Sequence, residues 1–171
     1  MKKAYIILLL LITILISVTG CAEEEEKAIG MIEKIERADW KLAMYSMDYD
    51  SYIREMDGLF SESYDPEKHQ RRVLQEPIDI RKITQEEREK FQETSDIKEV
   101  HVSISKVYEG EFANIFTKEE IHYHEQSPSY LMRKYILKEE DNQWTIVGVE
   151  GMAYDKPETR EKDWVHTFIV K

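Results

Sequence analysis

The sequence has few of the features that crosslink a small domain or mark a reaction centre. Cys21 is the single cysteine among 171 residues, so no disulfide can form within the chain. Positive charge is also scarce, because 24 Lys and Arg stand against 35 Asp and Glu, for a formal net charge of −11. Since phosphate binding needs a basic face, this balance argues against nucleic acid as a partner.

Several signatures of catalysis are missing as well. The chain contains no GxSxG, no glycine-rich phosphate loop, no CxxC and no HExxH, which argues against serine hydrolases, P-loop nucleotide enzymes and metalloproteases. It does have enough apolar material to fold, with 42% hydrophobic and 11% aromatic residues. A chain of about 150 residues, left after loss of a leader, suits one domain.

The N-terminus has the three parts of a secretory signal. Lys2 and Lys3 precede an uncharged run of 15 residues, Ala4 to Val18, and small residues follow it. A spanning helix needs about 20 apolar residues, and a glycine-cysteine pair ends this run. We therefore predict that residues 1–20 are a signal peptide that is removed. The alternative is a retained membrane anchor.

The end of this signal resembles the lipobox of bacterial lipoproteins. Val18-Thr19-Gly20-Cys21 places a small residue before a cysteine. The resemblance implies cleavage before Cys21 and a diacylglyceryl thioether on its sulfur, so that acyl chains hold the protein on the extracytoplasmic face of the cell membrane. Two chains anchor stably where one holds only marginally. Richness in lysine, glutamate and isoleucine favours a Gram-positive source.

Residues 21–27 are then the lipidated cysteine with an acidic linker. Its run of glutamates, Glu23 to Glu26, should stay extended and solvated because like charges repel. Residues 28–171 form the predicted domain.

The first half of this domain is predicted to be helical. From Ala28 to Tyr45 the apolar residues step by three and four, which favours a helix with one buried face; these residues are Ile32, Ile35, Ala38, Leu42 and Tyr45. Asp48 predicts the N-cap of a second helix, whose expected buried stripe is Tyr49, Ile53, Met56 and Phe60.

Two further helix starts follow in the sequence. Asp65-Pro66 pairs a capping residue with proline at the first helical position, for a helix that runs to about Gln75. Thr84 with Glu87 fits a capping box for a helix through about Glu93.

After Ser95 the pattern alternates, as in half-buried strands. Val100, Val102 and Ile104 define the first strand, and Phe112–Thr117 is the second. Ile121–Glu125 continues the second strand or follows it after a polar break. Later strands are expected at Tyr130–Leu137 and at Trp144–Val149, with a hairpin turn at Asp141-Asn142. Trp164–Val170 is able to add an edge strand. Helices followed by an antiparallel meander make an α+β class, with a sheet of about four to six strands.

Parts of this pattern resemble the nuclear transport factor 2-like superfamily. Trp40, the segment Met47-Asp48-Tyr49-Asp50-Ser51-Tyr52 and Leu59-Phe60 are similar to its helical opening, and Asp141 to Val147 is similar to its closing hairpin. The resemblance implies helices packed on a curved, cone-like sheet that often encloses a pocket. Members include isomerases, dehydratases and binding domains without chemistry.

The candidate pocket residues are His122, His124 and Tyr108. The two histidines share one face of a strand, and facing inward they would supply a base or half of a zinc site. Ile121 and Tyr123 make the better apolar face, which favours histidines that point outward. Tyr108 lines a pocket or simply packs. We predict no catalytic residue, metal or cofactor.

Two functions remain open on the sequence. The first is a lipid-anchored, non-catalytic binding or accessory module of the cell envelope with a protein partner. The alternative is a pocket protein for a small ligand, or an acid/base enzyme of the isomerase or dehydratase kind.

Overall fold

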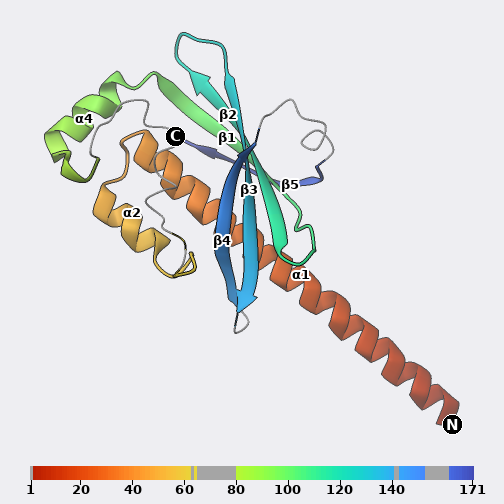
Figure 1. Ribbon diagram of the computed structural model, residues 1–171. Coiled ribbons are helices and arrows are strands. Elements are labelled where there is room, and N and C mark those ends of the chain that lie inside the picture. Colours follow the sequence, from red (N-terminus) through yellow and green to blue (C-terminus); the bar gives the residue numbers. More distant parts are fainter. Residues whose placement is uncertain (1, 63, 65–79, 141–142, 153–161) are drawn as a thin grey trace.

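A computed structural model describes residues 2–62, 64, 80–140, 143–152 and 162–171, with side chains from residue 23 onward. Helices come first along the chain and strands follow (Figure 1). The helical elements are α1 (Lys2–Ala43), α2 (Tyr49–Met56), the short 3-10 helix η1 (Ile80–Lys82) and α4 (Gln85–Thr94). The strands are β1 (Ile97–Ser105), β2 (Ala113–Tyr123), β3 (Ser129–Glu140), β4 (Gln143–Met152) and β5 (Trp164–Val170).

The strands form one open antiparallel sheet in the order β4-β3-β2-β1-β5, which is not closed into a barrel. The predicted α+β class is therefore confirmed, with five strands. The C-terminal segment lies as an edge strand beside β1, with Val170 opposite Val100. Its seven residues coincide with the predicted Trp164–Val170.

Helix α1 lies across one face of the sheet, with α2 beside it (Figure 1). The predicted buried face of this helix is confirmed at Ile32, Ile35, Ala38 and Leu42, which all belong to the core. It is wrong at Tyr45, because α1 ends at Ala43 and Tyr45 follows it with φ +59° and is only partly buried. Each strand adds inward side chains to the same core, among them Val100, Ile115, Tyr135, Ile146 and Phe168. Apolar burial against α1 is thus the main force that holds the two layers together.

Strand β2 is longer than the sequence predicts. The sequence predicts a polar break between Thr117 and Ile121, yet Ile121 continues the same strand and β2 runs unbroken from Ala113 to Tyr123. Glu119 in this stretch pairs with Val102 of β1 and Leu131 of β3. The strand continues through the charged residues because ladder hydrogen bonds form on both sides of it.

Helix α2 begins as predicted and presents a different face. Asp48 is its N-cap, and a side-chain oxygen accepts the Ser51 backbone N–H at 2.8 Å. The buried residues are Tyr52 and Met56, whereas Ile53 is 37% exposed. The predicted stripe is therefore wrong at Ile53. The helix faces the domain with Tyr52 instead, whose hydroxyl donates a hydrogen bond to Asp39 on α1.

Other predicted features have mixed outcomes. The capping box of Thr84 and Glu87 is present at the start of α4. Gly58 has φ +74°, a left-handed conformation that suits glycine, just after α2 ends. The expected helix from Asp65 to Gln75 and the turn at Asp141-Asn142 lie outside the described residues. Among the described residues, no helix is long and apolar enough to cross a membrane.

The acidic run is helical, which overturns the extended linker. Glu23 to Glu26 continue α1, and the Lys27 ammonium lies 3.1 Å from the Glu23 carboxylate and 3.0 Å from that of Glu24. Pairs at these spacings offset repulsion on a helix. Glu24 and Glu25 also accept hydrogen bonds from the end of the sheet, from Trp144 and Val107. This segment therefore belongs to the folded domain.

The N-cap of α2 gives the first prediction. Asp48→Ala removes the acceptor for the Ser51 N–H, so the free energy of unfolding should fall by about 1 kcal/mol. Chemical denaturation followed by circular dichroism measures this change. Asp48→Asn keeps a capping oxygen and should stay close to the parent protein. Equal losses in the two variants would contradict the capping role.

Candidate functional site

The structure places the predicted pocket residues apart. His122 lies on the outer face of β2, where its ring packs at a tilt against that of His101, with 4.4 Å between centroids, and its Nε2 lies 3.2 Å from the Glu120 carboxylate. His124 is exposed beyond the end of β2, and its backbone N–H donates to the Asp96 carbonyl. Tyr108 lies at the opposite end of β2, paired with Asn114. The three side chains therefore do not converge.

A small polar pocket lies elsewhere, at the start of α2. It has a volume of about 110 Å³ and is lined by Met47, Asp48, Tyr49, Asp50, Arg81, Ile83 and Arg88. Sites for small molecules usually measure roughly 300–1,000 Å³. None of the three predicted residues lines this pocket.

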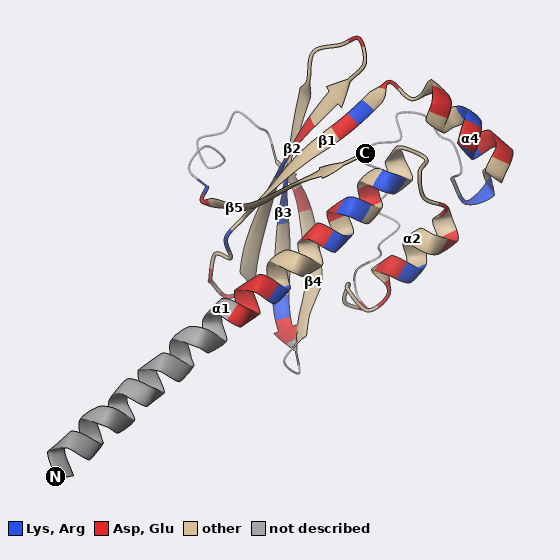
Figure 2. Ribbon diagram, turned by 180° about the vertical axis from the view of Figure 1, so that it is seen from behind, with Lys and Arg blue, Asp and Glu red and all other residues tan. Residues whose placement is uncertain are grey.

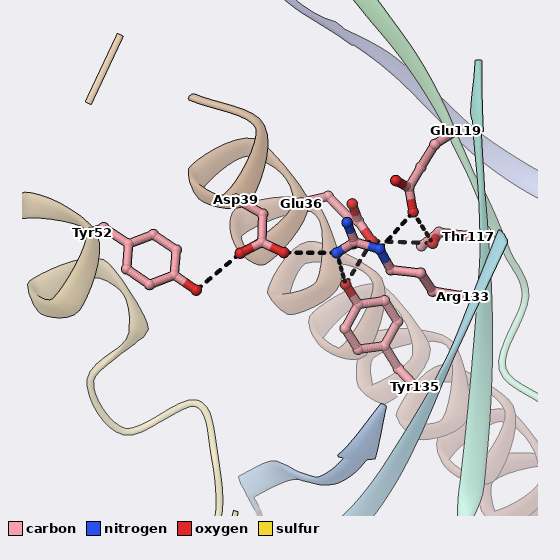
Figure 3. Close-up of polar contacts among 7 residues, drawn as sticks. All are labelled: Glu36, Asp39, Tyr52, Thr117, Glu119, Arg133 and Tyr135. Carbon is pink, nitrogen blue, oxygen red and sulfur yellow. Dashed lines mark hydrogen bonds and ion pairs between the residues drawn. The ribbon is translucent and has the colours of Figure 1, made fainter. Parts of the chain in front are cut away.

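The most unusual chemistry of the described residues is a cluster of buried polar side chains, which we call the Arg133 cluster (Figure 3). It joins side chains from two helices and two strands, and Figure 3 shows them pointing toward one another. Its members are Glu36 and Asp39 from α1, Tyr52 from α2, Thr117 and Glu119 from β2, and Arg133 and Tyr135 from β3.

The register of the sheet brings the strand members together. Thr117 stands directly opposite Arg133, and Ile115 stands opposite Tyr135. Residues of the same parity on these strands point to the same face, so Glu119 shares the inner face with Thr117. Glu36 and Asp39 are three apart on α1 and therefore face the sheet together.

Arg133 is the centre of the cluster and its one cationic side chain. Its Nη1 lies 2.7 Å from Asp39 Oδ2, and its Nε lies 2.8 Å from Glu119 Oε1. A longer contact of 3.7 Å joins Nη1 to Glu36 Oε1. One guanidinium thus bridges α1 and β2 from its place on β3.

Hydroxyl groups complete the cluster. Tyr135 donates to Glu36 Oε1 at 2.6 Å, and Tyr52 donates to Asp39 Oδ1 at 2.9 Å. The Thr117 hydroxyl lies 3.1 Å from Glu36 Oε1 and 3.3 Å from Glu119 Oε1. Each carboxyl group therefore has a protein partner in the interior, as buried charge requires.

Charge in the cluster is unbalanced, because three carboxyl groups face one guanidinium. Burial raises the pKa of Glu119 well above its ordinary value of 4.5, and the Glu36 and Asp39 carboxylates raise it further, while a hydrogen bond from Thr117 lowers it. Glu119 therefore stays protonated at a pH where surface glutamates are ionised.

The same burial and the same neighbouring charges also shift the pKa values of Tyr135 and Arg133. Burial and the Glu36 carboxylate raise the pKa of Tyr135, so its hydroxyl remains a donor. Burial lowers the pKa of Arg133, but the carboxylates of Glu36 and Asp39 more than offset this, so the guanidinium stays charged. A neutral Glu119 leaves two carboxylates around one cation.

A buried acid with a raised pKa is one requirement of general acid catalysis. The second requirement is that a substrate can reach the acid, and the structure does not meet it. Glu36, Thr117, Glu119 and Tyr135 are fully buried and Arg133 is 1% exposed. Among the described residues, no group of three or more His, Cys, Asp or Glu is arranged to hold a metal ion. The geometry is that of an internal brace between the layers.

Sequence reasoning missed this cluster, although a signal was present. Counting by twos from Ile115 through Thr117 to Ile121 places Glu119 on the apolar face of β2. The same count from Tyr135 places Arg133 inward on β3. A charged residue at an inward position on each of two adjacent strands predicts a buried ion pair, which the reading of a polar break concealed.

Comparison with known proteins adds no family assignment. No protein-family model matches the chain, and the searches of curated proteins and of solved structures found no match. The resemblance to the nuclear transport factor 2-like superfamily therefore stays a prediction.

The raised pKa of Glu119 predicts how stability depends on pH. Below pH 4.5 the folded and unfolded chains both hold this proton, so the stabilisation is fully present. As the pH rises further, the unfolded chain releases the proton and the folded chain keeps it. The free energy of unfolding should then fall by up to about 1.4 kcal/mol per pH unit, until the folded-state pKa is reached.

Glu119→Gln should abolish this loss, because the amide resembles the protonated acid. Denaturant titrations between pH 5 and pH 8 measure the slope. Glu120→Gln is the matched control, since its side chain lies on the outer face of the same strand, and it should keep the slope of the parent. A parent and a Glu119→Gln variant with the same slope would show that Glu119 is ionised in the folded protein.

Proposed function

We propose that this protein is a lipid-anchored, extracytoplasmic lipoprotein whose domain is a non-catalytic binding or accessory module of the cell envelope. The observation that carries this proposal is Val18-Thr19-Gly20-Cys21, placed directly after a basic start and an uncharged run. The signal directs export, and the acyl chains on Cys21 hold the domain at the membrane. A protein of the envelope is the partner.

Two features of the domain support this proposal. The mature domain contains no cysteine besides Cys21, so its fold needs no crosslink in an oxidising compartment. Its stability comes from the apolar core. The Arg133 cluster lies in the interior, with side chains at most 7% exposed. This burial keeps Glu119, whose pKa is raised, away from any substrate.

Cys21→Ser tests the anchor. Serine lacks the thiol that would form the thioether, so the variant should lose acyl labelling and accumulate as uncleaved precursor. Metabolic labelling with a fatty acid, followed by electrophoresis, measures both effects. Cys21 is the single cysteine, so a variant that is still labelled and cleaved would overturn the lipoprotein assignment.

Native mass spectrometry of residues 23–171 distinguishes a non-catalytic binding or accessory module from a protein that holds a small ligand in a pocket. This fragment keeps Glu24 and Glu25, which contact the sheet. We expect the mass of the bare polypeptide, as a monomer or a small oligomer. A bound small molecule that leaves on denaturation would contradict the proposal and favour a pocket protein or an enzyme.

A further inference from the structure

The helix that follows Cys21 is fastened to the domain almost at once. The Trp144 indole N–H of β4 donates to the Glu24 carbonyl at 3.2 Å, and the Glu25 carboxylate accepts the Val107 backbone N–H at 3.0 Å. Trp144 and Val107 also pack against the core. The first residues after the anchor are therefore held at the end of the sheet, with no flexible tether between.

Distances along the helix make this attachment short. Glu24 follows Cys21 by three residues, and an α-helix rises 1.5 Å per residue, which separates them by about 4.5 Å along the axis. The polar zone of one leaflet is roughly 5–7 Å thick. A thioether that lies within this polar zone leaves the end of the sheet within reach of the lipid headgroups.

The elements at this end of the domain are clear in Figure 1. The N-terminal part of α1 leaves the domain beside the β1–β2 loop and the paired ends of β3 and β4, where Glu140 stands opposite Gln143 (Figure 1). The β2–β3 loop and α4 lie at the far end (Figure 1). Within the β1–β2 loop, residues 106–112, Phe112 carries one of the few large apolar side chains that are exposed, at 40%.

We propose that the β1–β2 loop rests on the bilayer surface in the anchored protein, with the Phe112 ring in the headgroup zone and the α4 end turned away from the membrane. The inference rests on the proposed lipidation of Cys21. An apolar ring on a loop gains from the interface, and the rigid α1 connection keeps the loop there. The end formed by α4 and the β2–β3 loop is then the part of the domain farthest from the membrane.

Charge limits how deep this contact goes. Acidic residues, red in Figure 2, lie close together on α1 where it reaches the end of the sheet, and Glu109 and Glu111 add to them on the loop itself. Lys106 is paired with Asp163. Anionic lipid repels such a surface, so the contact is shallow and suits uncharged headgroups.

The test uses the mature lipidated protein in phosphatidylcholine vesicles. Acylation blocks Cys21, so Glu111→Cys on the exposed β1–β2 loop supplies one free thiol for an environment-sensitive fluorophore and leaves the Phe112 ring in place. Glu125→Cys on the exposed β2–β3 loop is the matched control. A nitroxide on the lipid near the headgroups should quench the label at position 111 roughly twofold or more above the label at position 125.

Two results would overturn the inference. Equal quenching at both positions, in protein that floats with the vesicles, would show that the domain has no fixed orientation; stronger quenching at position 125 would reverse it. Protein that fails to float with vesicles would instead refute the anchor itself, so the two failures are distinguishable.

A spacer tests whether the rigid connection causes the orientation. Ten Gly-Ser residues inserted between Ala22 and Glu23 behave as a flexible coil with an end-to-end distance of about 17 Å. Quenching at position 111 should then fall toward the level at position 125. Unchanged quenching at position 111 would show that rigidity of α1 does not set the orientation.

Discussion

The guanidinium of Arg133 is the contact on which the arrangement of the layers depends. It reaches Asp39 at 2.7 Å on α1 and Glu119 at 2.8 Å on β2 from its own strand, β3. A charge at this depth is tolerated only while its partners stay in place. Any other placement of α1 would leave buried carboxyl groups without the cation, so the cluster selects one register of helix on sheet.

The cluster has more carboxyl groups than cations, and a proton on Glu119 reduces this imbalance of charge. Apolar surroundings and two neighbouring carboxylates keep Glu119 neutral, and a neutral acid both accepts and donates hydrogen bonds. The arrangement resembles a catalytic acid in its pKa and differs from one in its burial. The perturbed group here braces the fold, which is a common structural origin of shifted pKa values.

Helix α1 combines two roles in one element. Its described side chains supply a broad apolar face to the core and two carboxyl groups to the Arg133 cluster. Its earlier part contains the proposed signal and Cys21, and its glutamates Glu24 and Glu25 are bonded to the sheet. In the function proposed here, anchor and domain form one rigid unit, so orientation at the membrane follows from the fold.

The sequence by itself determined the α+β class, the caps of α2 and α4 and the edge strand β5, because these depend on local periodicity and on side chains a few residues apart. The tertiary structure decided the face of α2, the continuity of β2 and the helical state of Glu23 to Glu26. It also decided the Arg133 cluster, whose members lie up to 99 positions apart, as between Tyr135 and Glu36. Such contacts follow from strand register and helix placement, which no local pattern specifies.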